Sequence, residues 1–141
     1  MVEPKGIQNV PPRQVWEALR SDPQAQLVDV RTEPEWTFVG VPDLAAAAKQ
    51  AVLIPWQVYP TMQHNDAFVD HLRQAGFTPE HHIYFLCRSG QRSLAAAQAA
   101  QEAGFPHVYN ISDGFEGGVD ADGHRGVKAG WKADDLPWRQ R

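Results

Sequence analysis

Short apolar segments alternate with helix-like segments over most of this 141-residue chain. The strand-like segments cover residues 26–30, 51–55, 82–86 and 107–110. The helix-like segments cover residues 12–20, 66–75 and 92–103. Because parallel strands need crossover connections, which are usually helices, this alternation favours a parallel sheet covered by helices. We therefore predict an α/β fold.

Individual residues predict where several elements begin and end. Thr32 and Glu35 have the spacing of a capping box, which predicts a short helix carrying Trp36. Gly76 follows the helix predicted before it, where glycine commonly forms a left-handed C-terminal cap. Residues 40–43 are predicted to form a loop.

The last part of the chain, from about residue 112 to residue 141, is rich in glycine and aspartate and has no periodic pattern. We expect an irregular segment that Trp131 and Trp138 fasten to the body of the protein. A chain of this length suits one domain, so we expect residues 1–141 to form a single domain that ends in this segment.

Composition argues against several classes of partner. The net charge is −4 and no basic run is present, so we expect no nucleic acid partner. No segment approaches the ~20 apolar residues of a membrane span, so we expect no membrane partner. The N-terminus lacks the apolar stretch of a signal peptide. One cysteine forms no internal disulfide, so we expect a reducing compartment, the cytoplasm.

The sole cysteine, Cys87, lies between a strand-like segment and a helix-like segment. The first turn of a helix offers unpaired N–H groups and the positive end of the helix dipole, which favour a thiolate. A lone cysteine is often only a small buried hydrophobe. Here, however, polar residues and two cations, Arg88 and Arg92, follow it. This context favours a nucleophile whose substrate or product is an anion.

The segment Cys87-Arg88-Ser89-Gly90-Gln91-Arg92-Ser93 resembles the active-site loop of rhodanese-type sulfurtransferases, C-R-x-G-x-R-S. Three other stretches match the same family in order. They are the D-V-R…E…G pattern within residues 27–40, the strand ending in proline at residues 52–55, and the glycines at 114–118 with Trp131 and Leu136-Pro137. The resemblance extends from Ile7 to Trp138. It implies a five-stranded parallel sheet flanked by helices on both faces.

The resemblance also implies roles for residues. Cys87 would take a sulfane sulfur as a persulfide and pass it to a thiol, cyanide or an acceptor protein. The residues that would cradle the outer sulfur or hold a small anionic donor such as thiosulfate are Arg88, Ser89, Gly90, Gln91, Arg92 and Ser93. Asp29 and Arg31 would be structural, pairing beside the loop. No cofactor and no metal are expected.

This chain departs from the family pattern in three places. Val41 follows Gly40 where the family usually has histidine, and residues 42–50 and 119–130 are longer than the usual connections. Both longer stretches are candidates for bordering the active site. They bear on substrate specificity and not on the sulfur chemistry.

Other functions remain open on the sequence alone. Cysteine phosphatases and arsenate reductases use C-x5-R, whereas Cys87 and Arg92 have the spacing C-x4-R, a narrower cradle that suits one sulfur. Asp43 and Asp113 are the candidate general acids for such a phosphatase. A non-catalytic binding module on the same fold is a further alternative. So is a persulfide relay to a partner protein, because no second cysteine can resolve the persulfide.

Overall fold

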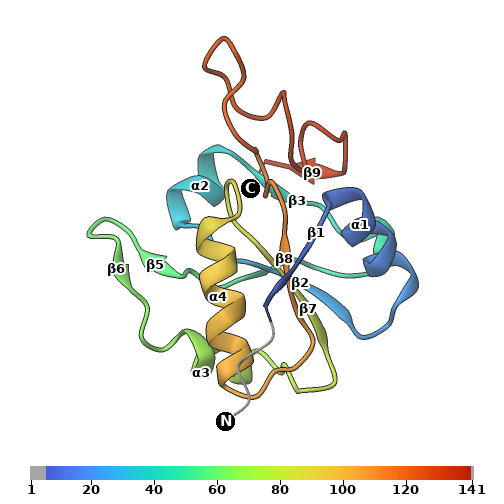
Figure 1. Cartoon of the computed structure of the whole chain (residues 1–141), viewed down its shortest axis with the longest axis vertical. Coiled ribbons are helices and arrows are strands. Elements are labelled where there is room, and N and C mark those ends of the chain that lie inside the picture. The colour runs from blue at the N-terminus through green and yellow to red at the C-terminus, as the bar shows by residue number, and fades with distance from the viewer. Residues whose placement is uncertain (1–5, 141) are drawn as a thin grey trace.

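The computed structural model describes residues 6–140, and its centre is a five-stranded parallel sheet, as the resemblance implied (Figure 1). The strand order is β1-β8-β7-β2-β4, and all neighbouring pairs are parallel. The strands are β1 (Gln8–Val10), β2 (Ala25–Asp29), β4 (Val52–Leu53), β7 (His82–Leu86) and β8 (Val108–Ile111). Because the strands all run in one direction, their carboxyl ends meet at one edge, where ligands bind in open α/β sheets.

Helices cover both faces of the sheet. They are α1 (Pro12–Ser21), α2 (Glu33–Phe38), α3 (Phe68–Gln74) and α4 (Gln91–Glu102), with a 3₁₀ turn, η1, at Ala45–Ala47. Figure 1 shows α3 and α4 on one side of the sheet and α1 on the other, while α2 lies near the carboxyl edge. No helix within residues 6–140 is both long and apolar enough to cross a membrane.

Alternate strand residues build the two halves of the core, because successive side chains of a strand point to opposite faces. Val28 and Phe85 pack with α3, α4 and Cys87 on one face. Leu27 and Leu86 pack with α1 and the C-terminal segment on the other. The buried alanines of α4 are Ala96, Ala97 and Ala100, whose small side chains let the helix lie close to the sheet. Cys87 therefore belongs to a well-packed core.

The stronger sequence signals predicted their elements well. The capping box of Thr32 and Glu35 is present, and α2 carries Trp36. Strand β7 has the predicted bounds, and α1 and α4 agree within one residue at each end. The strand predicted at 51–55 is only two residues long, and the strand predicted at 107–110 is shifted toward the C-terminus by one residue.

The loop predicted at residues 40–43 was wrong. Val41–Pro42 forms strand β3, which pairs antiparallel with β9 (Trp138–Arg139) from the far end of the chain. Strand β1 and the hairpin of β5 (Gln57–Val58) and β6 (Gln63–His64) were not predicted either. These elements are two or three residues long, so they leave no periodic pattern in the sequence.

The segment between β8 and β9, residues 112–137, forms turns without a helix or a strand. Trp131 is fully buried, donates from Nε1 to the carbonyl of Pro137 at 2.7 Å, and contacts Trp16 edge to face. Trp138 is more exposed, but its strand pairs with β3. These contacts hold the segment against the carboxyl edge of the sheet.

Candidate active site

Cys87 lies directly after β7, in the loop that leads into α4. The side chain is almost fully buried, with 1% of its surface exposed. Gly90 has φ +113°, a conformation that L-residues rarely adopt, and its N–H donates to Cys87 Sγ at 3.1 Å. The Ser93 hydroxyl is the second group beside the sulfur, at 3.2 Å between Oγ and Sγ. The loop therefore aims a backbone amide and a hydroxyl at one sulfur atom.

The other predicted cradle residues occupy different positions. Arg88 and Gln91 are exposed, while Ser89 and Arg92 are half-buried. The carbonyl of Arg88 accepts hydrogen bonds from the N–H groups of Glu116 and Gly117, at 3.0 and 3.1 Å. The C-terminal segment thus holds the loop backbone from outside, and the Arg88 side chain is left at the surface.

Arg92 forms a two-pronged ion pair with Glu35 of α2. Its Nη1 donates to Oε1 at 2.7 Å and its Nη2 donates to Oε2 at 2.9 Å. Burial would raise the pKa of Glu35, but the hydrogen bonds and charge of Arg92, together with Thr32, lower it below its usual value. The pKa of Arg92 is raised, because its partner Glu35 outweighs the effect of burial. Both groups are therefore charged, and an anionic ligand at Arg92 has to share it with Glu35.

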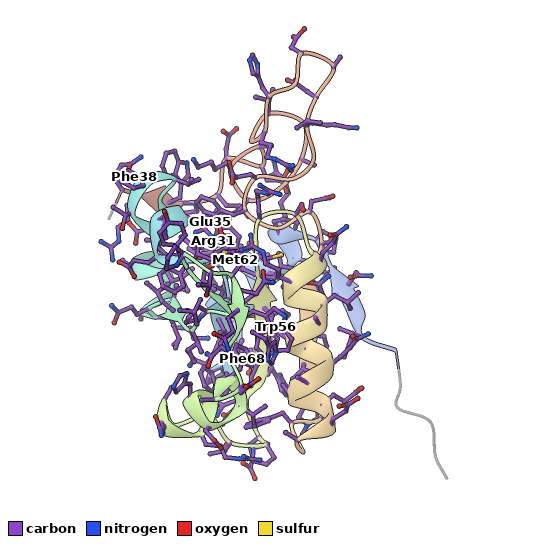
Figure 2. All side chains as sticks on the ribbon, turned by 90° about the vertical axis from the view of Figure 1, so that its left-hand side faces the viewer. Arg31, Glu35, Phe38, Trp56, Met62 and Phe68 are labelled. Carbon is purple, nitrogen blue, oxygen red and sulfur yellow. The ribbon has the colours of Figure 1, made fainter. Side chains whose placement is uncertain are left out.

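Asp29 and Arg31 form a fully buried ion pair beneath this site. Arg31 Nη2 donates to Asp29 Oδ2 and to the carbonyl of Gly40, both at 2.7 Å. The guanidinium of Arg31 also lies over the ring of Phe115, 4.3 Å from its centre. Figure 2 shows Arg31 and Glu35 near the N-terminal end of α4, with Phe38 pointing away from the body. The pair thus joins the end of β2, the chain that follows α2 and the C-terminal segment, which is the structural role that the resemblance implied.

Gly114 brings the C-terminal segment against the loop. A Cβ built on Gly114 would lie 2.4 Å from the carbonyl oxygen of Cys87, so only glycine fits without movement. The next residue, Phe115, donates its N–H to that same carbonyl at 2.8 Å. The backbone of Cys87 is therefore held by β7 on one side and by residues 114–115 on the other.

Sequence reasoning missed three residues that lie around the loop: Glu35 as the partner of Arg92, Asn110 as the partner of Ser93, and Asn9, which accepts a hydrogen bond from Asn110. Asn110 is a buried amide in the apolar strand β8. The one sequence signal for Asn110 is a polar residue within an apolar strand, because a buried polar group needs a hydrogen-bond partner.

The longer stretch at residues 42–50 borders a cavity away from the loop. This cavity has a volume of about 660 Å³ and lies beside β3, η1 and β4. Its lining residues are Val41, Pro42, Asp43, Leu44, Ala45, Lys49, Gln50, Ala51, Leu53 and Arg139, and Cys87 is not among them. Asp43, a candidate general acid, accepts the N–H of Ala45 in this region. Asp113 is exposed, and its backbone nitrogen lies near Gly90.

Comparison with known proteins extends over nearly the whole chain. Residues 8–141 match the family described as the STR4 middle domain. An uncharacterized protein of Rickettsia conorii is 38% identical over 134 residues, covering 94% of this chain and 98% of its own. A chloroplastic thylakoid rhodanese-like protein of Oryza sativa is 27% identical over 87% of this chain and 23% of its own.

Solved structures show the same fold. The crystal structure of Rv0390 from M. tuberculosis has 47% identity and a TM-score of 0.87, and covers 97% of this chain and 100% of its own. The polysulfide-sulfur transferase homodimer of Wolinella succinogenes has a TM-score of 0.64 at 20% identity, and the match covers 96% of this chain and 80% of its own. From the family match, these relatives and the geometry of the loop, we conclude that the chain belongs to the rhodanese-like proteins, in the family of the STR4 middle domain.

Proposed function

We propose that this protein is a sulfurtransferase that takes a sulfane sulfur from a thiosulfate-like anion onto Cys87 and passes it to an external acceptor. Sulfurtransferase-type activity is what the rhodanese-like family suggests. The observation that carries the proposal is the convergence of the Gly90 N–H and the Ser93 hydroxyl on Cys87 Sγ, at 3.1 and 3.2 Å. Fixed donors of this kind stabilise a sulfur that gains negative charge during the reaction.

The transfer takes place in two displacements. In the first, the Cys87 thiolate bonds to the terminal sulfur of the donor, the donor's sulfur–sulfur bond breaks, and sulfite leaves with the electron pair. In the second, an acceptor thiolate or cyanide bonds to the outer sulfur. The persulfide bond then breaks and Cys87 leaves as a thiolate. No redox cofactor or metal enters either step.

The two arginines contribute unequally to donor binding. Arg88 is exposed in the loop and reaches solvent, where an anion arrives. Arg92 is held by Glu35 through two hydrogen bonds. Arg88 is therefore the first cation that the donor meets, and Arg92 acts chiefly by fixing the start of α4.

The acceptor comes from outside the chain. Cys87 is the only cysteine, so the persulfide has no internal thiol with which to form a disulfide. A thiol, cyanide or an acceptor protein meets this need. A reducing cytoplasm would keep the single thiol available between turnovers.

Intact mass measurement tests the proposal. The protein is incubated with thiosulfate and, separately, with 3-mercaptopyruvate, and we expect thiosulfate to add the mass of one sulfur atom. Cyanide added afterwards should remove that mass and yield thiocyanate. The control is Cys87→Ser, which should fold, as judged by circular dichroism, and gain no sulfur. Sulfur uptake by the serine variant, or no uptake by the folded parent, would overturn the proposal.

A further inference from the structure

A chain of hydroxyl and amide groups begins at the sulfur of Cys87 and ends at Asn9, an exposed residue of β1. Ser93 Oγ lies 3.2 Å from Cys87 Sγ and 2.5 Å from Asn110 Oδ1. Asn110 Nδ2 donates to Asn9 Oδ1 at 2.9 Å and to the carbonyl of Gly90 at 3.2 Å. Ser93 and Asn110 are buried, so their hydrogen bonds are made within the protein.

The carbonyl of Gly90 determines which way the amide of Asn110 faces. A backbone carbonyl only accepts hydrogen bonds, so the amide nitrogen is the atom that faces it. The amide oxygen of Asn110 consequently faces Ser93, and this oxygen also only accepts. A serine hydroxyl has a single hydrogen. Ser93 therefore donates either to Asn110 or to Cys87 Sγ, and not to both at once.

We propose that Asn110 is a positioning residue that controls the direction of the Ser93 hydroxyl and, through it, the ionisation of Cys87. While Cys87 is a thiol, Ser93 donates to Asn110 and accepts the S–H. When the thiol gives its proton to water, the hydroxyl turns to donate to the sulfur, and Asn110 loses its hydrogen bond. Asn110 thus competes with the thiolate for the one hydrogen of Ser93.

The same competition accompanies sulfur transfer. Once Sγ carries a second sulfur, the negative charge moves to the outer atom, and the hydroxyl returns to Asn110. The hydroxyl therefore turns once in each half of the cycle. Only this last step rests on the proposed function, because ionisation of Cys87 is measurable without any transfer of sulfur.

The charged groups around Cys87 are distinct from this hydroxyl–amide chain, and a neutral substitution at Asn110 alters none of them. They lie in the loop, at the ends of β2 and α2, and in the C-terminal segment: Arg88, Arg92, Asp29, Arg31, Glu35, Asp113, Glu116 and Lys132. Because these charges stay constant, a change in the ionisation of Cys87 reports on the hydrogen bonds and not on a changed field.

The experiment measures the rate at which iodoacetamide alkylates Cys87 as a function of pH, since only the thiolate reacts. In Asn110→Leu the hydroxyl is released to the thiolate, so the midpoint of the profile should move to lower pH by about 0.5–1 unit, the size of one hydrogen bond. In Ser93→Ala the thiolate loses a donor, so the midpoint should move to higher pH by a similar amount.

The double variant Ser93→Ala with Asn110→Leu tests whether Asn110 acts on Cys87 through Ser93 or by another route. If Asn110 works through Ser93, Asn110→Leu should cause no further shift in a Ser93→Ala background. The matched control is Asn9→Ala, which removes one partner of the Asn110 amide, leaves the bond to Gly90, and should leave the midpoint unchanged.

Two results would overturn the inference. One is an equal shift in the presence and absence of the Ser93 hydroxyl, which would mean that Asn110 acts through Gly90 and the loop backbone. The other is a shift of Asn110→Leu to higher pH. If Asn110→Leu does not fold, Asn110→Ala replaces it with the same expected direction. Sulfur uptake by the parent is followed separately, so the expected shifts without any uptake would reject the proposed function and retain this inference.

Discussion

Glu35 accepts hydrogen bonds from two segments of the chain. Thr32 Oγ1 donates to its Oε1 at 2.9 Å within the capping box of α2, and Arg92 donates to both of its oxygens from α4. One carboxylate therefore caps a short helix and fixes the start of the helix that follows Cys87. Its lowered pKa means that the charged form stabilises the folded protein.

Replacing this carboxylate should give a stability loss that depends on pH. We expect Glu35→Gln to lower the free energy of unfolding by about 1.5–3 kcal/mol at pH 7, the range for hydrogen bonds to charged groups. The pKa of Glu35 in the folded protein lies below its ordinary value of 4.5, so the contribution is complete above that ordinary value and is lost as pH falls through the folded pKa. Urea titrations of both proteins at pH 7 and at steps below pH 4.5 should show the difference narrowing. A difference that is constant over this range would contradict the assignment.

Arg88 should act on donor binding and not on stability. We expect Arg88→Gln to lower kcat/KM for thiosulfate about 10–100-fold, equivalent to one lost charged hydrogen bond of about 1.5–3 kcal/mol. The control is Arg13→Gln, an exposed arginine of α1, which should leave the kinetics unchanged. Steady-state assays of thiocyanate formation measure both. Equal kinetics for Arg88→Gln and the parent would place the anion elsewhere.

At the scale of elements, the sequence predicted the strands and helices that have a local residue pattern. Strand β7 and helix α4 follow from an apolar run and an alanine-rich stretch, and Cys87, Gly90 and Ser93 lie together because a single loop joins these two elements. The pairing of β3 with β9 depends on contacts between the two ends of the chain, which no local window contains. Glu35 and Asn110 reach the site for the same reason, from α2 and β8.

The close approach of the C-terminal segment to the Cys87 loop can be tested by comparing alanine substitutions at two glycines of that segment. Gly114 and Gly123 both have positive φ, +59° and +80°, but only at Gly114 would a Cβ meet the loop backbone. We expect Gly123→Ala to cost about 1–2 kcal/mol from backbone strain alone. Gly114→Ala should cost more than this and should also slow sulfur uptake, because Cys87 must move. Chemical unfolding and intact mass measure the two effects, and equal costs for the two variants would show that the contact is dispensable.

At the scale of the whole molecule, Trp131 joins the C-terminal segment to α1. It is fully buried against Trp16, and we expect Trp131→Ala to lower the free energy of unfolding by about 3–5 kcal/mol. Trp138 is 40% exposed, so Trp138→Ala should cost clearly less. Urea denaturation followed by circular dichroism compares the two variants. A larger loss for Trp138→Ala would mean that the pairing of β9, and not the buried indole, holds the segment.

Both outer strands of the sheet are short, and each has a proline within two residues of its carboxyl end. β1 has three residues and precedes Pro11 and Pro12, and β4 has two residues and precedes Pro55. The strand of a second molecule can add to an exposed sheet edge through unpaired backbone groups. Proline has no backbone N–H with which to extend the pairing, and strands of two or three residues expose few unpaired backbone groups. Edge-to-edge aggregation, a common hazard of open sheets, is therefore largely prevented at both edges.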